Sequence, residues 1–201
     1  MRLLMIRHGH SRHAERGLIA DVAACEGLSD AGRAQADALA GRLGHEARGG
    51  WSLISSPVPR ALQTAEIVEA ALNQGAPALE PDLREQLPGD AEGLDWPAFQ
   101  ARFGPFNPRE EPDRPFSPGG ESWRQFEARV AALLTRLASR EDDVIAVTHA
   151  GFIVVATLQL MGSGEEHAWL QPANTGISEW RHDGARWRLE RYNDTAHLGH
   201  P

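Results

Sequence analysis

The sequence predicts an α/β protein, a three-layer sandwich in which a mostly parallel central sheet carries helices on both faces and ends in a C-terminal antiparallel hairpin. Two observations lead to this class. Short apolar runs typical of buried strands alternate with segments whose apolar residues recur at helical spacing. Near the C-terminus, two strand-like segments over residues 176–181 and 186–191 flank Asp183-Gly184, a pair that favours a tight hairpin turn.

The first half of the chain predicts two strands and two helices. Residues 3–6 form an apolar run that stops at a polar cluster, residues 7–11, which is typical of a buried strand followed by a functional loop. Ser29 is suited to begin a helix, because its side chain can accept a hydrogen bond from a free backbone N–H, and apolar residues then recur at helical spacing. Residues 51–54 predict the second strand, and the next helix runs through residues 61–68.

A proline-rich segment interrupts this alternation. Seven of the 13 prolines fall within residues 84–121, so we expect a loop-rich, lid-like insertion there with one short helix near Trp96. The alternation resumes with a helix over 126–137, a β-branched strand over 144–147 and an apolar helix over 152–161. A chain of 201 residues can bury one substantial core, and we expect a single domain over residues 1–201.

The composition excludes several classes of function. All 20 basic residues are arginine and the formal net charge is −8, which argues against a nucleic-acid-binding protein and against binding to an anionic membrane. The absence of lysine excludes Schiff-base and P-loop chemistry. The single cysteine, Cys25, excludes an internal disulfide and a cysteine-built zinc site. Apolar runs are too short to span a bilayer and residues 1–6 too short for a signal peptide, so we expect a cytoplasmic location.

Polar side chains follow three of the predicted strands. His8 comes directly after the first strand, Arg60 follows the second, and His149 follows the β-branched strand. Ligands of open α/β sheets bind beyond the carboxyl ends of the strands, so we expect these three side chains to meet at one site.

The residue types at this site suit the transfer of a phosphoryl group. A neutral imidazole such as that of His8 is a competent nucleophile when its other nitrogen is held by a hydrogen-bond acceptor. Arg7 beside it and Arg60 offer planar donor pairs that fit phosphoryl oxygens. These side chains predict a cationic pocket, suited to a small phosphorylated substrate, within an acidic protein.

Six blocks of the sequence add a family resemblance. The run Arg7-His8-Gly9-His10-Ser11 resembles the R-H-G-x-[ST] signature of the histidine phosphatase superfamily, the phosphoglycerate mutase-like family. Five further blocks resemble that family's patterns in the right order: residues 28–36, 55–65, 83–85, 119–122 and 147–151. Together they span most of the chain, which makes the signal far more specific than the first triplet alone.

The resemblance implies a two-step phosphoryl transfer without metal or cofactor. His8 is expected to become a phosphohistidine, and Glu85 to protonate the departing oxygen and then help to activate water. Arg7, Arg60 and His149 are expected to hold the phosphoryl oxygens, and Ser11 to bind substrate as well. Glu92 is the nearest competing carboxylate, and we expect Glu121 to cap the helix that follows it.

Two positions depart from the family pattern, with consequences for the phosphate pocket. Ala14 stands where the family often has a phosphate-binding asparagine, and Ala150 replaces the first glycine after the second histidine. A phosphatase fits this rather short chain best. A phosphoglycerate mutase and a non-catalytic regulator that binds a phosphorylated ligand remain alternatives. The oligomeric state is left open.

Two further questions stay open in the sequence. His8, His10 and His13, with Asp21 and His149, could instead be ligands of a metal-dependent hydrolase, although Arg7 beside the first ligand repels a cation. The aromatic residues of the insertion could cover a substrate or form a small core of their own: Trp96, Phe99, Phe103 and Phe106.

Overall fold

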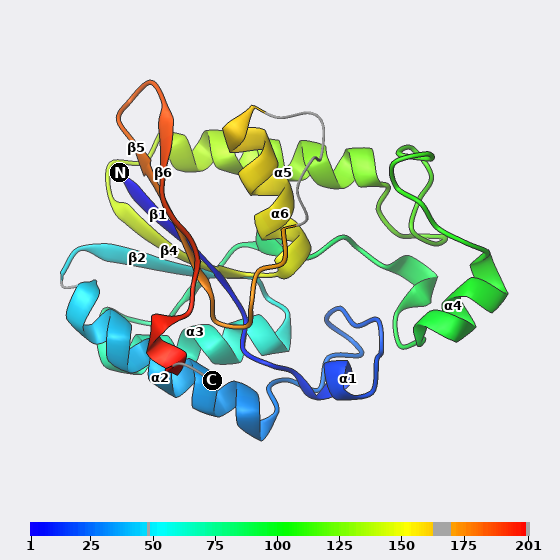
Figure 1. Ribbon diagram of the computed structural model, residues 1–201, viewed down its shortest axis with the longest axis horizontal. Helices are drawn as coiled ribbons and strands as arrows, with labels where there is room; N and C mark the ends of the chain where they lie inside the picture. Colours follow the sequence, from blue (N-terminus) through cyan, green and yellow to red (C-terminus); the bar gives the residue numbers. More distant parts are fainter. Residues whose placement is uncertain (48, 163–169, 200–201) are drawn as a thin grey trace.

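The computed structural model describes residues 1–47, 49–162 and 170–199, and in this part of the chain six strands form one sheet (Figure 1). The sheet order is β3-β2-β4-β1-β5-β6. The strands β3, β2, β4 and β1 run parallel to one another, whereas β5 is antiparallel to both of its neighbours, β1 and β6. The strands are β1 (Arg2–Arg7), β2 (Trp51–Ser55), β3 (Ala78–Leu79), β4 (Asp143–Thr148), β5 (Ile177–His182) and β6 (Trp187–Asp194).

Helices cover both faces of the sheet (Figure 1). α2 (Asp30–Glu46) and α3 (Pro59–Leu72) pack on one face, and α5 (Trp123–Ala138) and α6 (Ala150–Met161) on the other. Two shorter helices, α1 (Arg12–Glu15) and α4 (Trp96–Phe103), lie away from the sheet. Three 3₁₀ turns complete the described elements: η1 (Pro81–Leu83), η2 (Gly89–Ala91) and η3 (Ala196–Leu198). The predicted three-layer α/β class with its C-terminal hairpin is confirmed.

Successive side chains of β1 point to opposite faces of the sheet, and each face contacts its own layer of the hydrophobic core. Leu3 and Met5 face the layer formed with α5 and α6, and Leu4 and Ile6 face the layer formed with α2 and α3. All four side chains are buried because β1 lies inside the sheet and helices cover both of its faces. This placement explains the uninterrupted apolar run, and it leaves the polar residues after Arg7 at the edge of the sheet.

Local capping sets where two of the helices begin. The side chain of Ser29 accepts a hydrogen bond from Gly32 N at 3.1 Å, so Ser29 is the N-cap of α2, as expected. α5 begins with a capping box between Ser122 and Gln125. The expectation that Glu121 caps α5 was therefore wrong: Ser122 occupies the cap, and Glu121 lies one residue earlier with its carboxylate paired to Arg129.

The proline-rich insertion has a small core of its own. Ala91, Phe99 and Phe116 are buried together, and Phe103 and Phe106 pack against them. α4 begins at Trp96, as predicted, with Asp95 as its N-cap. The insertion thus forms an apolar body beyond the carboxyl ends of the strands. Its role as a lid, and the description of the chain as one domain, stay predictions.

Three features were not visible in the sequence pattern. β3 is a two-residue edge strand and α1 a single turn, both too short to show a period. The order of the strands, with β1 between β4 and β5, depends on contacts that are distant in the sequence.

Among the described residues, no helix is long and apolar enough to cross a membrane.

Candidate active site

A cavity of about 640 Å³ opens where β1 and β4 end and α3 begins. Five of the predicted site residues line it: Arg7, His8, Ser11, Arg60 and Glu85. Because β1, β2 and β4 are parallel neighbours, their carboxyl ends meet at one edge, and this edge gathers Arg7 and His149, which are 142 positions apart in the sequence.

His8 is held in the form a nucleophile requires. Its Nδ1 lies 2.7 Å from the carbonyl oxygen of Gly9, and since a carbonyl only accepts, Nδ1 carries the proton. Nε2 therefore keeps its lone pair, which accepts a hydrogen bond from Arg60 Nε at 3.0 Å. Burial and then the charge of Arg60 lower the pKa of His8 well below 6.5, so the ring is neutral at physiological pH.

Arg60 is fixed from two sides. It lies in the first turn of α3 and is 4% exposed, and its Nη1 donates to the Ala20 carbonyl at 2.9 Å. Thr64, one turn later, accepts a hydrogen bond from Gly9 N at 3.1 Å and so ties α3 to the loop that carries His8. This arrangement places a permanent positive charge beside His8 Nε2.

Arg7 brings a second guanidinium group to the cavity. Its Nη1 donates to the Pro172 carbonyl at 2.7 Å, and its Nε has no hydrogen-bond partner among the described residues. Burial is the largest influence on Arg7 and lowers its pKa below the ordinary value of an arginine, while the nearby Glu85 carboxylate raises it. Donors therefore remain available for an anion.

His149 lies against His8 and is almost fully buried. The two ring centroids are 5.1 Å apart with the planes at 62°. His149 Nε2 is 2.9 Å from the Ser56 hydroxyl, and its Nδ1 has no partner within the described part of the chain. Burial, followed by the charge of Arg60, lowers the pKa of His149 well below 6.5. His149 thus packs against one side of the His8 ring, and its contact with substrate stays a prediction.

Glu85 lines the same cavity as the arginines, and its carboxylate is held by the N-terminus of a helix. Its Oε2 accepts a hydrogen bond from Gly151 N at 2.8 Å, in the first turn of α6. A Cβ atom at residue 151 would lie 2.3 Å from Glu85 Oε1, so only glycine leaves room for this carboxylate. The rival Glu92 does not line the cavity; it accepts hydrogen bonds from Asp21 N and Ala24 N.

Arg129 on α5 holds the segment that carries Glu85, a role that sequence reasoning missed. It donates to the carbonyls of Asp82, Arg84 and Glu85 at 2.6, 3.0 and 3.1 Å. It also forms a two-pronged pair with the Glu121 carboxylate at 2.7 and 2.9 Å. The available signal was an arginine beside the apolar stripe of a helix, which is too common to identify by itself.

The rim of the cavity contains the other predicted polar residues and one that was missed. Ser11 is buried, and its hydroxyl lies 3.4 Å from His13 Nε2. Burial lowers the pKa of His13 to about 4. Asn174 Nδ2 donates to the His8 carbonyl at 2.9 Å; it lies in a loop that the sequence pattern did not single out. Ala14 also lines the cavity, where it offers no polar atom to a phosphate.

The residues considered as metal ligands do not converge. In residues 1–47, 49–162 and 170–199, no group of three or more His, Cys, Asp or Glu side chains is placed to hold a metal ion. His10 turns toward the Ser29 hydroxyl at 2.9 Å, and His8 toward Gly9 and Arg60. The donor set of a metal-dependent hydrolase is thus not assembled by these side chains.

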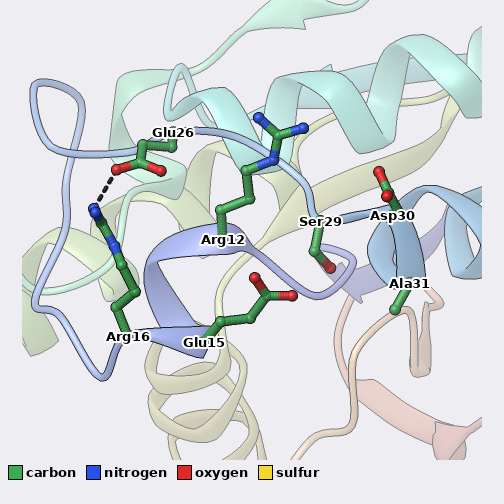
Figure 2. A pocket seen from close by; sticks show the side chains of 7 residues that line it. All are labelled: Arg12, Glu15, Arg16, Glu26, Ser29, Asp30 and Ala31. Carbon is green, nitrogen blue, oxygen red and sulfur yellow. Dashed lines mark hydrogen bonds and ion pairs between the residues drawn. The ribbon is translucent and has the colours of Figure 1, made fainter.

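A second, smaller hollow of about 270 Å³ lies beside α1 and the start of α2 (Figure 2). Two arginines and three carboxylates line it, and Arg16 is already paired with Glu26. Its charges are mixed and are shared by exposed side chains, so it lacks the convergence of like donors seen around His8. The lining residues are Arg12, Glu15, Arg16, Glu26, Ser29, Asp30 and Ala31.

Comparison with known proteins identifies the family of this chain. The model of the histidine phosphatase superfamily (branch 1) matches residues 3–195. The chain belongs to this superfamily. The predicted family is confirmed, and with it the expectation of an enzyme of the phosphomonoesterase class.

Relatives within the family cover nearly the whole chain. It is 30% identical over 209 residues to phosphoglycerate mutase-like protein 4 of Arabidopsis thaliana, covering 98% of this chain and 86% of that one. It is 28% identical over 206 residues to the metal-independent phosphoserine phosphatase of the same plant, covering 98% and 82%. Among solved structures, a mycobacterial glucosyl-3-phosphoglycerate phosphatase in complex with VO3 superposes with a TM-score of 0.79 at 26% identity, covering 96% of this chain and 98% of that one.

Proposed function

We propose that this protein hydrolyses a small phosphomonoester through a covalent phosphohistidine on His8, with Glu85 as the proton donor. The observation that carries the proposal is the state of the His8 ring: Nδ1 is held by the Gly9 carbonyl, and the Nε2 lone pair faces a guanidinium group. A neutral imidazole fixed in this way can attack phosphorus without first losing a proton.

The first step transfers the phosphoryl group to the protein. His8 Nε2 forms a bond to phosphorus while the bond from phosphorus to the ester oxygen breaks, and protonated Glu85 gives its proton to the leaving oxygen. Arg7, Arg60 and His149 stabilise the three equatorial oxygens. Removing one such pre-organised donor typically costs about 3 kcal/mol in the barrier. The alcohol then leaves through the open side of the cavity.

The second step releases phosphate. Glu85, now ionised, takes a proton from a water molecule as the water oxygen bonds to phosphorus and the bond between phosphorus and Nε2 breaks. Inorganic phosphate leaves, and His8 returns to its neutral form. Glu85 serves both steps because the leaving oxygen and the attacking water occupy the same side of phosphorus in turn.

Covalent labelling tests the proposal. Substrate carrying radioactive phosphate, quenched within one turnover, should leave a label on His8 that is lost in acid and kept in base. A label on serine, or no label in the quenched enzyme, contradicts the proposal. His8→Ala should abolish both the label and the turnover of an aryl phosphate, and a rate equal to that of wild type would assign the reaction elsewhere.

Analysis of the products formed from a phosphoglycerate separates the phosphatase from the two alternative functions. A phosphoglycerate mutase would convert one phosphoglycerate isomer into the other without net release of phosphate, so both products are measured in one reaction. A binding-only regulator would bind substrate but show no rate above that of the His8→Ala control. We expect phosphate release that exceeds isomer formation.

A further inference from the structure

The cavity has two chemically different walls. One wall carries the groups that surround the His8 ring and the Glu85 carboxylate. The other is apolar and is formed largely by the insertion and by the loop after α1: Leu18, Ile19, Pro88, Trp96, Phe106, Pro108 and Phe116, with Trp123 from the start of α5. At about 640 Å³, the space is far larger than a phosphate ion needs.

The aromatic part of this wall is rigid and supported from behind. Phe116 stacks on the fully buried Phe99 with ring centroids 4.7 Å apart. Phe106 and Trp96 both meet Phe116 edge-on, at 5.0 and 5.9 Å. Trp96 is nevertheless 51% exposed, so a large apolar ring is left in water at the cavity mouth. Such exposed apolar surface beside a polar site is typical of a ligand-binding surface.

The cations of the cavity are all gathered at the phosphoryl end. Of the described residues that line it, those with a guanidinium group are Arg7 and Arg60. Asp21 lines the cavity as a carboxylate, and Arg84 is bound to it, with Nε donating to Oδ1 at 3.1 Å. His13 is neutral near pH 7 because burial lowers its pKa to about 4. A second anionic group on a substrate would therefore meet Asp21, the aromatic wall or the polar side chains of His10, Gln86 and Asn174, rather than a further guanidinium group of the described lining.

From these two walls we infer that the natural substrate is a monophosphate ester of an uncharged, largely apolar group with a flat ring, which lies against Trp96, Phe106 and Phe116. This inference rests on the proposed function and assigns its substrate class. It sets this chain apart from the relatives named for phosphoserine and glucosyl-3-phosphoglycerate, since both of those compounds carry a carboxylate.

Binding of phosphonates tests the inference without turnover. Calorimetry compares three probes whose carbon–phosphorus bond the enzyme does not hydrolyse: propylphosphonate, 3-phenylpropylphosphonate and 3-phosphonopropanoate. Burying the phenyl ring should tighten binding about tenfold or more relative to propylphosphonate, whereas the carboxylate should bring no gain. A preference for 3-phosphonopropanoate, equal affinity for all three probes, or no measurable binding overturns the inference.

Two variants locate the effect, and a third serves as the control. Trp96→Ala should remove most of the phenyl advantage, measured as the ratio of the affinities for 3-phenylpropylphosphonate and propylphosphonate. Phe106→Leu, which preserves an apolar side chain, should reduce the advantage in part. Trp187→Ala removes a tryptophan from the remote hairpin strand β6 and should leave the advantage intact. An equal loss in the Trp96 and Trp187 variants contradicts the assignment of the wall.

Turnover then separates this inference from the proposed function. With 2-phenylethyl phosphate, ethyl phosphate and 3-phosphoglycerate, all esters of primary alcohols, kcat/KM should be highest for the phenyl ester. If 3-phosphoglycerate is hydrolysed fastest, the substrate class is wrong while the phosphatase proposal stands. If wild type hydrolyses none of the three faster than His8→Ala, the phosphatase proposal fails, and the order of phosphonate affinities still decides what the cavity binds.

Discussion

The backbone N–H of Gly151 donates a 2.8 Å hydrogen bond to the Glu85 carboxylate, and that carboxylate fills the space where a side chain at residue 151 would lie. The carboxylate of a residue 66 positions earlier therefore occupies this place only because residue 151 has no Cβ. The contact links the N-terminus of α6 directly to the group that we propose as the proton donor. It also explains why glycine at 151 matters here, whereas alanine is accommodated at 150.

Gly151→Ala should displace Glu85 and slow turnover. A Cβ atom 2.3 Å from Oε1 forces the carboxylate to move, so kcat/KM for an alkyl phosphate, which reports the steps up to loss of the alcohol, should fall about 100-fold. The loss for an activated aryl phosphate should be small, because its leaving oxygen needs no proton. Steady-state kinetics with both esters measures the difference. Gly41→Ala is the matched control: it has open space around it on α2, and it should leave both rates unchanged. Equal losses for both esters would mean that the displaced group is not the acid.

Arg129→Met should weaken both the fold and the proton-donor step. The substitution leaves the Glu121 carboxylate and three backbone carbonyls without their donor in a mostly buried place, which typically costs about 3–5 kcal/mol. Urea denaturation measures the free energy of unfolding, and the ratio of kcat/KM for an alkyl phosphate to that for an aryl phosphate reports the position of Glu85.

Arg136→Met on the same helix is the control for that variant. Arg136 pairs with Glu80 and Asp82 at the surface, where the loss should stay below about 1 kcal/mol. If Arg129→Met lowers stability but leaves the alkyl-to-aryl ratio at its wild-type value, Arg129 has a structural role alone.

Phosphorylation of His8 should not decline as the pH falls from 7 to about 5.5. Burial and the charge of Arg60 lower the pKa of His8 well below 6.5, so the nucleophile stays neutral through this range. Quench-flow measurement of the phosphoenzyme burst against pH checks this. Arg60→Gln removes the nearby positive charge, raises the pKa of His8, and should bring the acid-side decline to higher pH along with a lower overall rate. A wild-type burst that halves near pH 6.5 would show an ordinary, unshifted imidazole.

Stability should fall as the pH drops below about 6.5. His8, His13 and His149 all have a lowered pKa in the folded state, for His13 about 4, mainly because of burial. In the unfolded chain each of these rings takes up a proton near pH 6.5, so protons favour unfolding below that pH. Their contribution to the free energy of unfolding is complete above pH 6.5 and is lost progressively toward the folded pKa values. Urea titrations at pH 7.5, 6 and 5 measure the trend, and His149→Asn should flatten it. A free energy that is constant over this range contradicts the prediction.

The motifs near the strand ends could be predicted from the sequence because they are local. The order of His8, Arg60 and His149 after apolar runs places them at the carboxyl ends of strands, and the parallel sheet brings them to one edge. Ser29 as an N-cap was confirmed for the same reason, since capping depends on neighbours within one turn, and a short helix near Trp96 was confirmed as well.

Other parts of the site could not be predicted because they depend on contacts between distant residues. Arg129 and Glu121 resemble ordinary charged residues of a helix and a turn until α5 packs beside the segment that carries Glu85. Glu85 and Glu92 were distinguished in the structure by their hydrogen-bond partners, which lie 66 and at least 68 residues away. The aromatic residues of the insertion proved to be both a small core and a cavity wall, because Phe116 belongs to each.

The sequence by itself determined the fold class and the family and singled out His8 as the candidate nucleophile, since periodicity, caps and short motifs are carried by residues close together along the chain. The tertiary structure alone decided which nitrogen of His8 keeps its lone pair, what holds Glu85 in place and how the far side of the cavity is lined. Those properties arise from burial and from donor–acceptor distances between elements, and neither quantity exists until the sheet and its helices have packed.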